Sequence, residues 1–296
     1  MMTMQEMVDF IQEHKMNIYS LTVIENGQIN SREINGANAC NDIYSISKNF
    51  TATAIGILCD RGQLSLSDTV WDIFHEDYPA LCTELWKAVT VEHVLTQTIG
   101  ISGGFLDIDV EDVRTYSSRD YMEMILSAPL AYAPGEKMVY SDSNYYLASR
   151  IAAKAAGERL QDFLQRELFE PLEFQGQAWA CCPLGHAMGA TGLFIRVVDM
   201  AKFGQLYLQN GEWNGRQLLS PRWVREATVP RFTDNYGYSF WMQGEGRYAC
   251  GGMYGQNVII LPRCNTVVAW QAYDPQGKTG ALVGEILRRE SSDRRA

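Results

Sequence analysis

The segment YSISKNFTATAIGILCDRG, residues 44–62, decides how the rest of the chain is interpreted. Its second half is almost wholly apolar, which predicts a central, buried helix from about Ser45 to Arg61. Ser45 and Lys48 lie three positions apart at its start, and this spacing places both side chains on one face of a helix. A lysine at the head of an apolar helix is costly unless it has a partner or a function.

Ser45 and Lys48 have the residue types that nucleophilic catalysis needs. A serine hydroxyl needs a base beside it before it can attack a carbonyl. Desolvation by the apolar helix would lower the pKa of Lys48 from about 10.4 toward neutrality and make it that base. With 17 serines and 7 lysines in 296 residues, S-x-x-K arises by chance roughly 0.4 times. The prediction of a catalytic Ser-Lys pair therefore depends on the position of this four-residue motif at the start of an apolar helix.

The composition is that of an ordinary globular protein. The chain has 296 residues, 46% of them hydrophobic and 20% charged, enough for one large domain or two smaller ones. A net charge of -10 argues against nucleic acid or an anionic membrane as a partner, because phosphate binding needs clustered Lys and Arg. The N-terminus lacks a signal-peptide pattern and no apolar stretch reaches membrane-spanning length, so we expect a cytoplasmic protein. No pattern indicates its oligomeric state.

The seven cysteines show no CxxC spacing and the four histidines are scattered. An odd number of unspaced cysteines is typical of reduced thiols and not of a disulfide framework or a zinc site. The sequence therefore predicts neither a metal nor a cofactor.

Strand patterns lie at both ends of the chain, and helical patterns fill the middle. Residues 17–35 alternate around an Asn-Gly turn, and four short β-rich runs follow one another between residues 236 and 273. This order predicts an α/β (α+β) fold with an antiparallel sheet of about five strands from both termini, flanked by helices, and an inserted, mainly helical domain. We expect residues 1–62 and 190–296 to form the sheet domain and residues 63–189 the insertion.

Two other motifs could also indicate a catalytic site. GISGG, residues 100–104, matches G-x-S-x-G, and Ser102 is followed by Asp142 and His186 in the order of α/β-hydrolases. That fold requires a strand before the serine, whereas a helical segment precedes it here, so a glycine-rich turn is favoured. The tripeptide KTG, residues 278–280, spells a serine β-lactamase motif. No strand pattern follows it, which favours a turn and a helix start.

A third segment supplies a tyrosine that can transfer protons. PGEKMVYSDSNYYLASRIA, residues 134–152, places Tyr140 and Asp142 in a turn before a helix. A tyrosine hydroxyl near the Ser-Lys pair can relay a proton to a leaving group. The alternative is a buried core tyrosine.

Taken together, these segments resemble the penicillin-recognising serine hydrolases, specifically the class C β-lactamase-like branch that includes D-aminopeptidases and esterases. The resemblance extends over nearly the whole chain. Its segments are residues 44–70, similar to the family's nucleophile helix and the stretch after it; VEHVLTQTIGISGG, similar to LLTHTSG; PGEKMVYSDSNYY, similar to Y-x-N; and residues 190–219. Gln97 and Ile99 replace the family's His and Ser, which we interpret as structural drift.

The resemblance implies a set of site residues. Ser45 matches the acylated nucleophile, Lys48 its base or proton carrier, and Tyr140 the catalytic tyrosine. CGGMYGQ, residues 250–256, has the position of the family's third motif. The backbone N–H groups of Ser45 and Met253 would form the oxyanion hole. The implied substrate-binding residues are Asp142, which stands where the motif usually has Asn, and Cys250, Gly251 and Gly252.

The implied function is hydrolysis of a small-molecule ester, amide or peptide through an acyl-enzyme. Cys250 replaces the lysine or histidine that helps to hold the carboxylate of β-lactams and D-Ala peptides, and a neutral thiol cannot supply that bond. An esterase or small amidase is therefore the leading expectation. A β-lactamase or D-Ala-type peptidase, and a catalytically idle penicillin-binding-like sensor or binding protein, are the alternatives.

Overall fold

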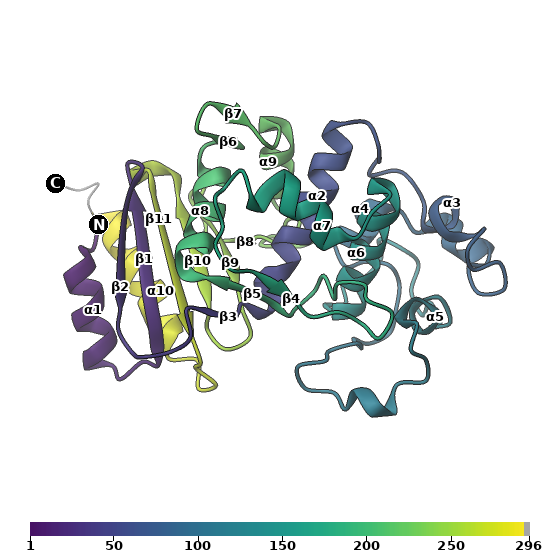
Figure 1. Ribbon diagram of the computed structural model, residues 1–296, viewed down its shortest axis with the longest axis horizontal. Helices are drawn as coiled ribbons and strands as arrows, with labels where there is room; N and C mark the ends of the chain where they lie inside the picture. Colours follow the sequence, from purple (N-terminus) through teal and green to yellow (C-terminus); the bar gives the residue numbers. More distant parts are fainter. Residues whose placement is uncertain (293–296) are drawn as a thin grey trace.

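A six-stranded antiparallel sheet forms one end of the molecule and a mainly helical region forms the other (Figure 1). The computed structural model describes residues 1–292. The strand order is β2-β1-β11-β10-β9-β8, so strands from both ends of the chain share one sheet. The predicted fold class is therefore confirmed, with six strands where about five were expected.

The strands alternate with many helices along the chain. The strands are β1 Ile18–Glu25, β2 Gln28–Glu33, β3 Cys40–Asp42, β4 Ala178–Trp179, β5 Leu193–Arg196, β6 Glu212–Trp213, β7 Arg216–Gln217, β8 Trp241–Met242, β9 Tyr248–Gly251, β10 Asn257–Leu261 and β11 Thr266–Ala272. The α-helices are α1 Met4–Glu13, α2 Ser47–Asp60, α3 Val70–Phe74, α4 Val91–Leu95, α5 Tyr121–Leu126, α6 Asp142–Ala156, α7 Leu160–Leu164, α8 Val197–Leu208, α9 Pro221–Ala227 and α10 Thr279–Ser292. Short 3-10 turns lie at Tyr44–Ile46 (η1), Glu84–Ala88, Val113–Thr115 and Pro262–Cys264, and a π-turn at Gln165–Phe169.

The Asn-Gly turn between β1 and β2 explains why this segment forms a hairpin. Asn26 and Gly27 have φ angles of 50° and 79°, the left-handed pair that a type I′ turn requires and that Asn-Gly adopts at little cost. β1 then pairs with β2 on one side and with β11 on the other.

Both faces of the sheet are covered by helices. Along β11, Val267 and Ala269 belong to the larger apolar cluster, whereas Val268 and Trp270 belong to a second one. This alternation follows from the two-residue period of a strand. Helix α8 packs against one face, and α1 and α10 cover the other.

Helix α2 is central, as the sequence predicts. All of its residues from Ser47 to Leu58 are buried. It packs against α6 and α7 in the helical region. A second, three-stranded sheet, in the order β3-β5-β4, joins the segment before α2 to the segment that leads into α8. The chain around residue 190 therefore lies beside the start of α2.

Among residues 1–292 no helix is long and apolar enough to cross a membrane.

Candidate active site

Ser45 lies in the η1 turn directly before α2 and is half-buried. The residue before it, Tyr44, has a φ of 49°, an unusual left-handed conformation for an aromatic residue. The backbone N–H of Tyr44 donates to Asp42 Oδ1 at 2.7 Å, which holds this turn in place. A strained backbone of this kind is often found beside functional side chains.

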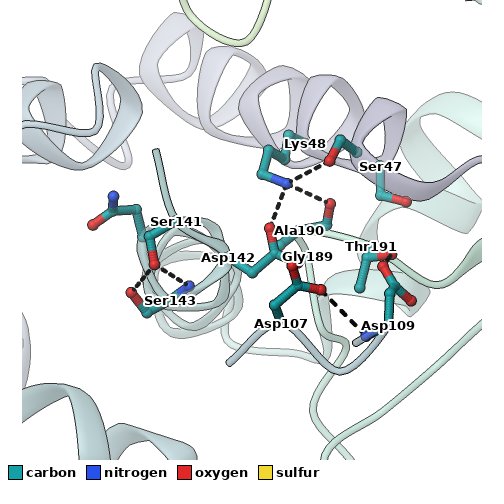
Figure 2. A network of polar contacts seen from close by, with 12 residues as sticks. Ser47, Lys48, Asp107, Asp109, Ser141, Asp142, Ser143, Gly189, Ala190 and Thr191 are labelled. Atoms are coloured by element: carbon teal, nitrogen blue, oxygen red, sulfur yellow. Dashed lines mark hydrogen bonds and ion pairs between the residues drawn. The ribbon is translucent and has the colours of Figure 1, made fainter. Parts of the chain in front are cut away.

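Lys48, in the first turn of α2, is fully buried and hydrogen-bonded to Ser45. Its Nζ donates to Ser45 Oγ at 3.0 Å, to Asp142 Oδ1 at 2.6 Å and to the Ala190 carbonyl at 3.1 Å. Figure 2 shows Lys48 between α2 and the start of α6, with Asp142 and Ala190 facing it. The predicted Ser-Lys pair is thus brought together in space.

Asp142 is the first residue of α6, and its side chain is 8% exposed. Negative charge is favourable at a helix N-terminus, and the Ser141 side chain caps the same turn by accepting from Ser143 N. These features position Asp142 against Lys48. The sequence resemblance assigned Asp142 to the substrate; in the structure its partner is the lysine.

The pKa of Lys48 corrects the expectation of a neutral amine. Burial lowers it and is the largest single influence, but the electrostatic interactions and hydrogen bonds that Lys48 makes with Tyr140 and Asp142 together outweigh burial. The pKa of Lys48 is therefore raised from 10.5 and not lowered toward neutrality.

Tyr140 lies just before α6 and is 42% exposed, so it is not the buried core tyrosine considered as the alternative. Lys48 Nζ lies 4.9 Å from the centroid of its ring. The ring stacks on Trp241 at 6.1 Å and meets Tyr236 edge-on at 6.3 Å. Tyr140 therefore lies beside the Ser-Lys pair.

The third-motif segment lies against the nucleophile turn. Gly252, just after β9, leaves no room for a side chain: a Cβ there would lie 2.7 Å from the Ile43 carbonyl oxygen and 2.5 Å from Gln256 Oε1. Strand β9 contacts η1, and Met253 follows with 44% exposure. The segment expected to supply half of an oxyanion hole therefore packs against Ile43, which lies two positions before Ser45 in the sequence.

Cys250 and Gly251 are consecutive in β9, so they face opposite sides of the strand. The Cys250 side chain has no exposed area, belongs to the larger apolar cluster, and burial raises its pKa well above 9.0. Its thiol is neutral and packs in the core. Gly251 is half-buried, with open space where a Cβ would be.

Gln97, interpreted from the sequence as drift, is a buried hydrogen-bonding centre. Its Oε1 accepts from the backbone N–H of Ser141 at 2.6 Å, and its Nε2 donates to Tyr236 Oη at 2.8 Å. It therefore holds both the turn that carries Tyr140 and an aromatic ring that Tyr140 contacts. No signal in the sequence distinguished this amide from the loop around it.

Three further carboxylates surround the pair, and the sequence did not single them out. Asp107 and Asp109 come from the loop after α4, and with Asp142 their oxygens lie within 4.8 Å of one another (Figure 2). Burial and, less strongly, the charge of Asp109 raise the pKa of Asp42, in β3, to about 6, against backbone hydrogen bonds from Tyr44 and Gly192 that lower it. Burial also raises the pKa values of Asp107 and Asp109.

Lys48 is the cation beside this cluster of carboxylates, and it pairs with Asp142. Asp42, Asp107 and Asp109 form no ion pair with any residue in the described part of the chain. The site therefore has an excess of negative charge, and we assign no metal to it.

Two competing motifs are ruled out by their surroundings. Ser102 lies in an exposed bend with no helix directly after it, so it is not at the strand-turn-helix elbow of an α/β-hydrolase. Lys278 lies beyond the end of β11, and Thr279 opens α10. The tripeptide at residues 278–280 is therefore a helix start, as predicted.

The sheet, the inserted helices and a serine-lysine pair at the head of the central helix define the class of penicillin-recognising serine hydrolases. The Beta-lactamase family model matches residues 5–289. The chain therefore belongs to the beta-lactamase family, a family of serine hydrolases.

The relatives differ in their activities. A beta-lactamase of Escherichia coli K12 is 29% identical over 142 residues, which cover 48% of this chain and 35% of that protein. The 6-aminohexanoate-dimer hydrolase of Paenarthrobacter ureafaciens is 24% identical, over 83% of this chain and 70% of that protein. The chain thus spans about a third of the first relative and most of the second.

The fold is also found among solved structures. The octameric penicillin-binding protein homologue of Pyrococcus abyssi superposes with a TM-score of 0.75 and 21% sequence identity, over 97% of this chain and 78% of that one. At this identity the likeness concerns the fold alone.

Proposed function

We propose that the protein is an esterase or small amidase that works through an acyl-enzyme on Ser45. The observation that carries the proposal is the 3.0 Å hydrogen bond between Lys48 Nζ and Ser45 Oγ, at the head of a buried helix and beside Tyr140. A half-buried serine with a cation and a tyrosine in reach is the arrangement that nucleophilic catalysis requires.

The reaction proceeds in two steps. Ser45 Oγ attacks the carbonyl carbon of the substrate while its proton passes to the Lys48–Tyr140 pair, and the carbonyl oxygen becomes an oxyanion. The backbone N–H groups of Ser45 and Met253 are the proposed donors to that oxyanion. The tetrahedral intermediate then expels the leaving group, which takes up a proton, and water releases the acyl group from Ser45 in the second step.

The charge of the site favours a substrate without a carboxylate. Lys48 is already bound by Asp142, and Asp42, Asp107 and Asp109 add negative charge around it. An anionic group placed there is repelled, because a site lined by one sign of charge excludes that sign. β-Lactams and D-Ala-type peptides carry such a group, whereas a simple ester or amide does not.

A panel of neutral esters, neutral amides and a chromogenic cephalosporin tests this proposal. Wild-type protein and Ser45→Ala are assayed side by side. We expect ester or amide turnover at least about 100-fold above that of Ser45→Ala, and slower cephalosporin turnover. Cephalosporin turnover well above that of the esters would indicate a β-lactamase, and equal traces from both proteins would indicate a binding or sensor protein.

A further inference from the structure

Gln97 is a buried glutamine in the turn after α4, and its backbone has an unusual conformation. The residue is 1% exposed. Its φ of 59° lies in the left-handed region, which few residues other than glycine adopt. Such a conformation persists only where the surrounding contacts hold it, and it is often found at functional sites. The contacts of Gln97 therefore indicate what the residue does.

Gln97 binds the backbone on both sides of Tyr140. Its carbonyl oxygen accepts from the backbone N–H of Val139 at 2.9 Å, and its side-chain Oε1 accepts from the backbone N–H of Ser141 at 2.6 Å. Asn144 Nδ2 donates to the Val139 carbonyl at 3.0 Å, which ties the same turn to α6. Tyr140 is thus the single residue between two backbone groups that one glutamine holds.

The other end of the Gln97 amide fixes an aromatic ring that Tyr140 contacts. Gln97 Nε2 donates to Tyr236 Oη at 2.8 Å, and both side chains are buried. The Tyr236 ring meets the rings of Tyr140 and Trp241 edge-on, at 6.3 Å and 4.7 Å between centroids. Trp241 in turn stacks on Tyr140. One amide therefore supports both the backbone of Tyr140 and the aromatic surroundings of its ring.

An amide is suited to this position because it accepts and donates hydrogen bonds at the same time. A carboxylate of the same length would accept from the Ser141 N–H but could not donate to Tyr236 Oη. A methionine would do neither, and it would deprive two buried polar groups of these partners, which is unfavourable. The two contacts of Gln97 thus depend on the chemistry of its side chain and not only on its size.

We propose that Gln97 is a positioning residue that holds Tyr140 beside Lys48 and Ser45, through the backbone on both sides of Tyr140 and through Tyr236. The inference rests on the proposed function above, in which Tyr140 takes part in the proton transfer from Ser45. Tyr140 is 42% exposed and Lys48 Nζ lies 4.9 Å from its ring centroid, so its position must be fixed from the buried side. A displacement of about 1 Å can slow a reaction about 100-fold.

The kinetics of Ser45 labelling by a fluorophosphonate test the inference, because this probe needs no knowledge of the substrate. The maximum labelling rate and the half-saturating probe concentration are measured for wild type, Gln97→Met, Tyr140→Phe and the double variant. For Gln97→Met we expect a maximum rate about 10- to 100-fold lower, with the half-saturating concentration within about threefold of wild type. In the Tyr140→Phe background we expect the same substitution to cost less than about threefold, because residues that act as a unit are not additive.

Tyr207→Phe is the matched control for the loss of a buried polar contact. Tyr207 has no exposed area, and its Oη pairs with Thr53 Oγ1 at 2.8 Å between α8 and α2. We expect Tyr207→Phe to lower the midpoint of urea unfolding, as Gln97→Met does, but to keep the maximum labelling rate within about twofold of wild type.

The outcomes separate the inference from the proposed function. If wild-type Ser45 takes no label, the proposed function fails. If it is labelled but Gln97→Met is labelled as fast, or loses as much in the Tyr140→Phe background as in wild type, only the inference is overturned. Where Tyr140→Phe is too slow to measure, equal losses of rate in Gln97→Met and Tyr207→Phe overturn the inference.

A further variant covers the case in which Gln97→Met does not fold. Tyr236→Phe keeps the ring that Tyr140 contacts and removes the hydroxyl that Gln97 Nε2 binds. We expect its maximum labelling rate to be about 3- to 10-fold below that of wild type, at an unchanged half-saturating concentration. A rate equal to that of wild type would contradict the inference.

Discussion

Single residues decide the chemistry of this site, and the sequence indicated some of them. The pattern S-x-x-K predicted that Ser45 and Lys48 meet, because both lie in one turn of chain. It could not predict the charge of Lys48, since that depends on Asp142, 94 positions away in the sequence. The local apolar surroundings pointed to a neutral amine; the distant carboxylate reverses this.

Gln97 illustrates a residue whose importance depends on the fold. Its two strong hydrogen bonds reach Ser141 and Tyr236, which are 44 and 139 positions away. An amide in a loop gives no periodic or motif signal of such contacts. Its place in the structure becomes visible only when the three segments are brought together.

At the same scale, the raised pKa of Asp42 predicts that the stability of the protein depends on pH. Its pKa in the folded protein is raised from 3.8 to about 6, so the folded state binds this proton more tightly than the unfolded chain does. Stability therefore falls as the pH rises from about 4 to about 6, by at most about 3 kcal/mol at 1.36 kcal/mol per pH unit.

The substitution Asp42→Asn tests this directly, since an amide oxygen can still accept from Tyr44 N. We expect the variant to gain stability over wild type at pH 8 and to show no gain at pH 4, measured by urea unfolding. Asp9→Asn, at an exposed position, is the control. Parallel wild-type and Asp42→Asn curves across this range would show that the carboxylate is not destabilised by folding.

At the scale of elements, long and strongly patterned segments were predicted and short ones were not. The hairpin of β1 and β2, the meander of β8 to β11 and the buried helix α2 all follow from alternation, an Asn-Gly turn or an apolar run. The small sheet of β3, β4 and β5 was missed, because strands of two to four residues carry too little pattern. Yet this sheet places the Ala190 carbonyl beside α2.

The end of β9 provides a prediction about an element. Gly252→Ala introduces a Cβ that meets Ile43 O and Gln256 Oε1, so the segment must shift and carry Met253 with it. We expect the rate of Ser45 labelling to fall by about 10- to 100-fold with the fold retained. Labelling rate and circular dichroism are the measurements.

The neighbouring glycine is the matched comparison. A Cβ on Gly251 meets no atom within 4 Å, so Gly251→Ala is expected to lose much less. Equal rates for Gly252→Ala and wild type would argue that the Met253 N–H contributes nothing to the oxyanion.

At the scale of the whole molecule, the sheet formed by both chain ends was predictable, because strand patterns flank a helical middle. The family was predictable as well, since several motifs occur in the right order over nearly the whole chain. The division into residues 1–62 with 190–296 and residues 63–189 stays a prediction. An ester or amide substrate, expected from the sequence because of Cys250, stays a proposal. The carboxylates around Lys48 that support it were not singled out, because they come from three separate segments.

The most direct test of the central claim is peptide mapping by mass spectrometry after treatment with a fluorophosphonate. The account predicts a single stoichiometric adduct on the peptide that contains Ser45, and no adduct in Ser45→Ala. A wild-type protein that stays unlabelled, or that carries its label on Ser102 or another serine, would contradict it.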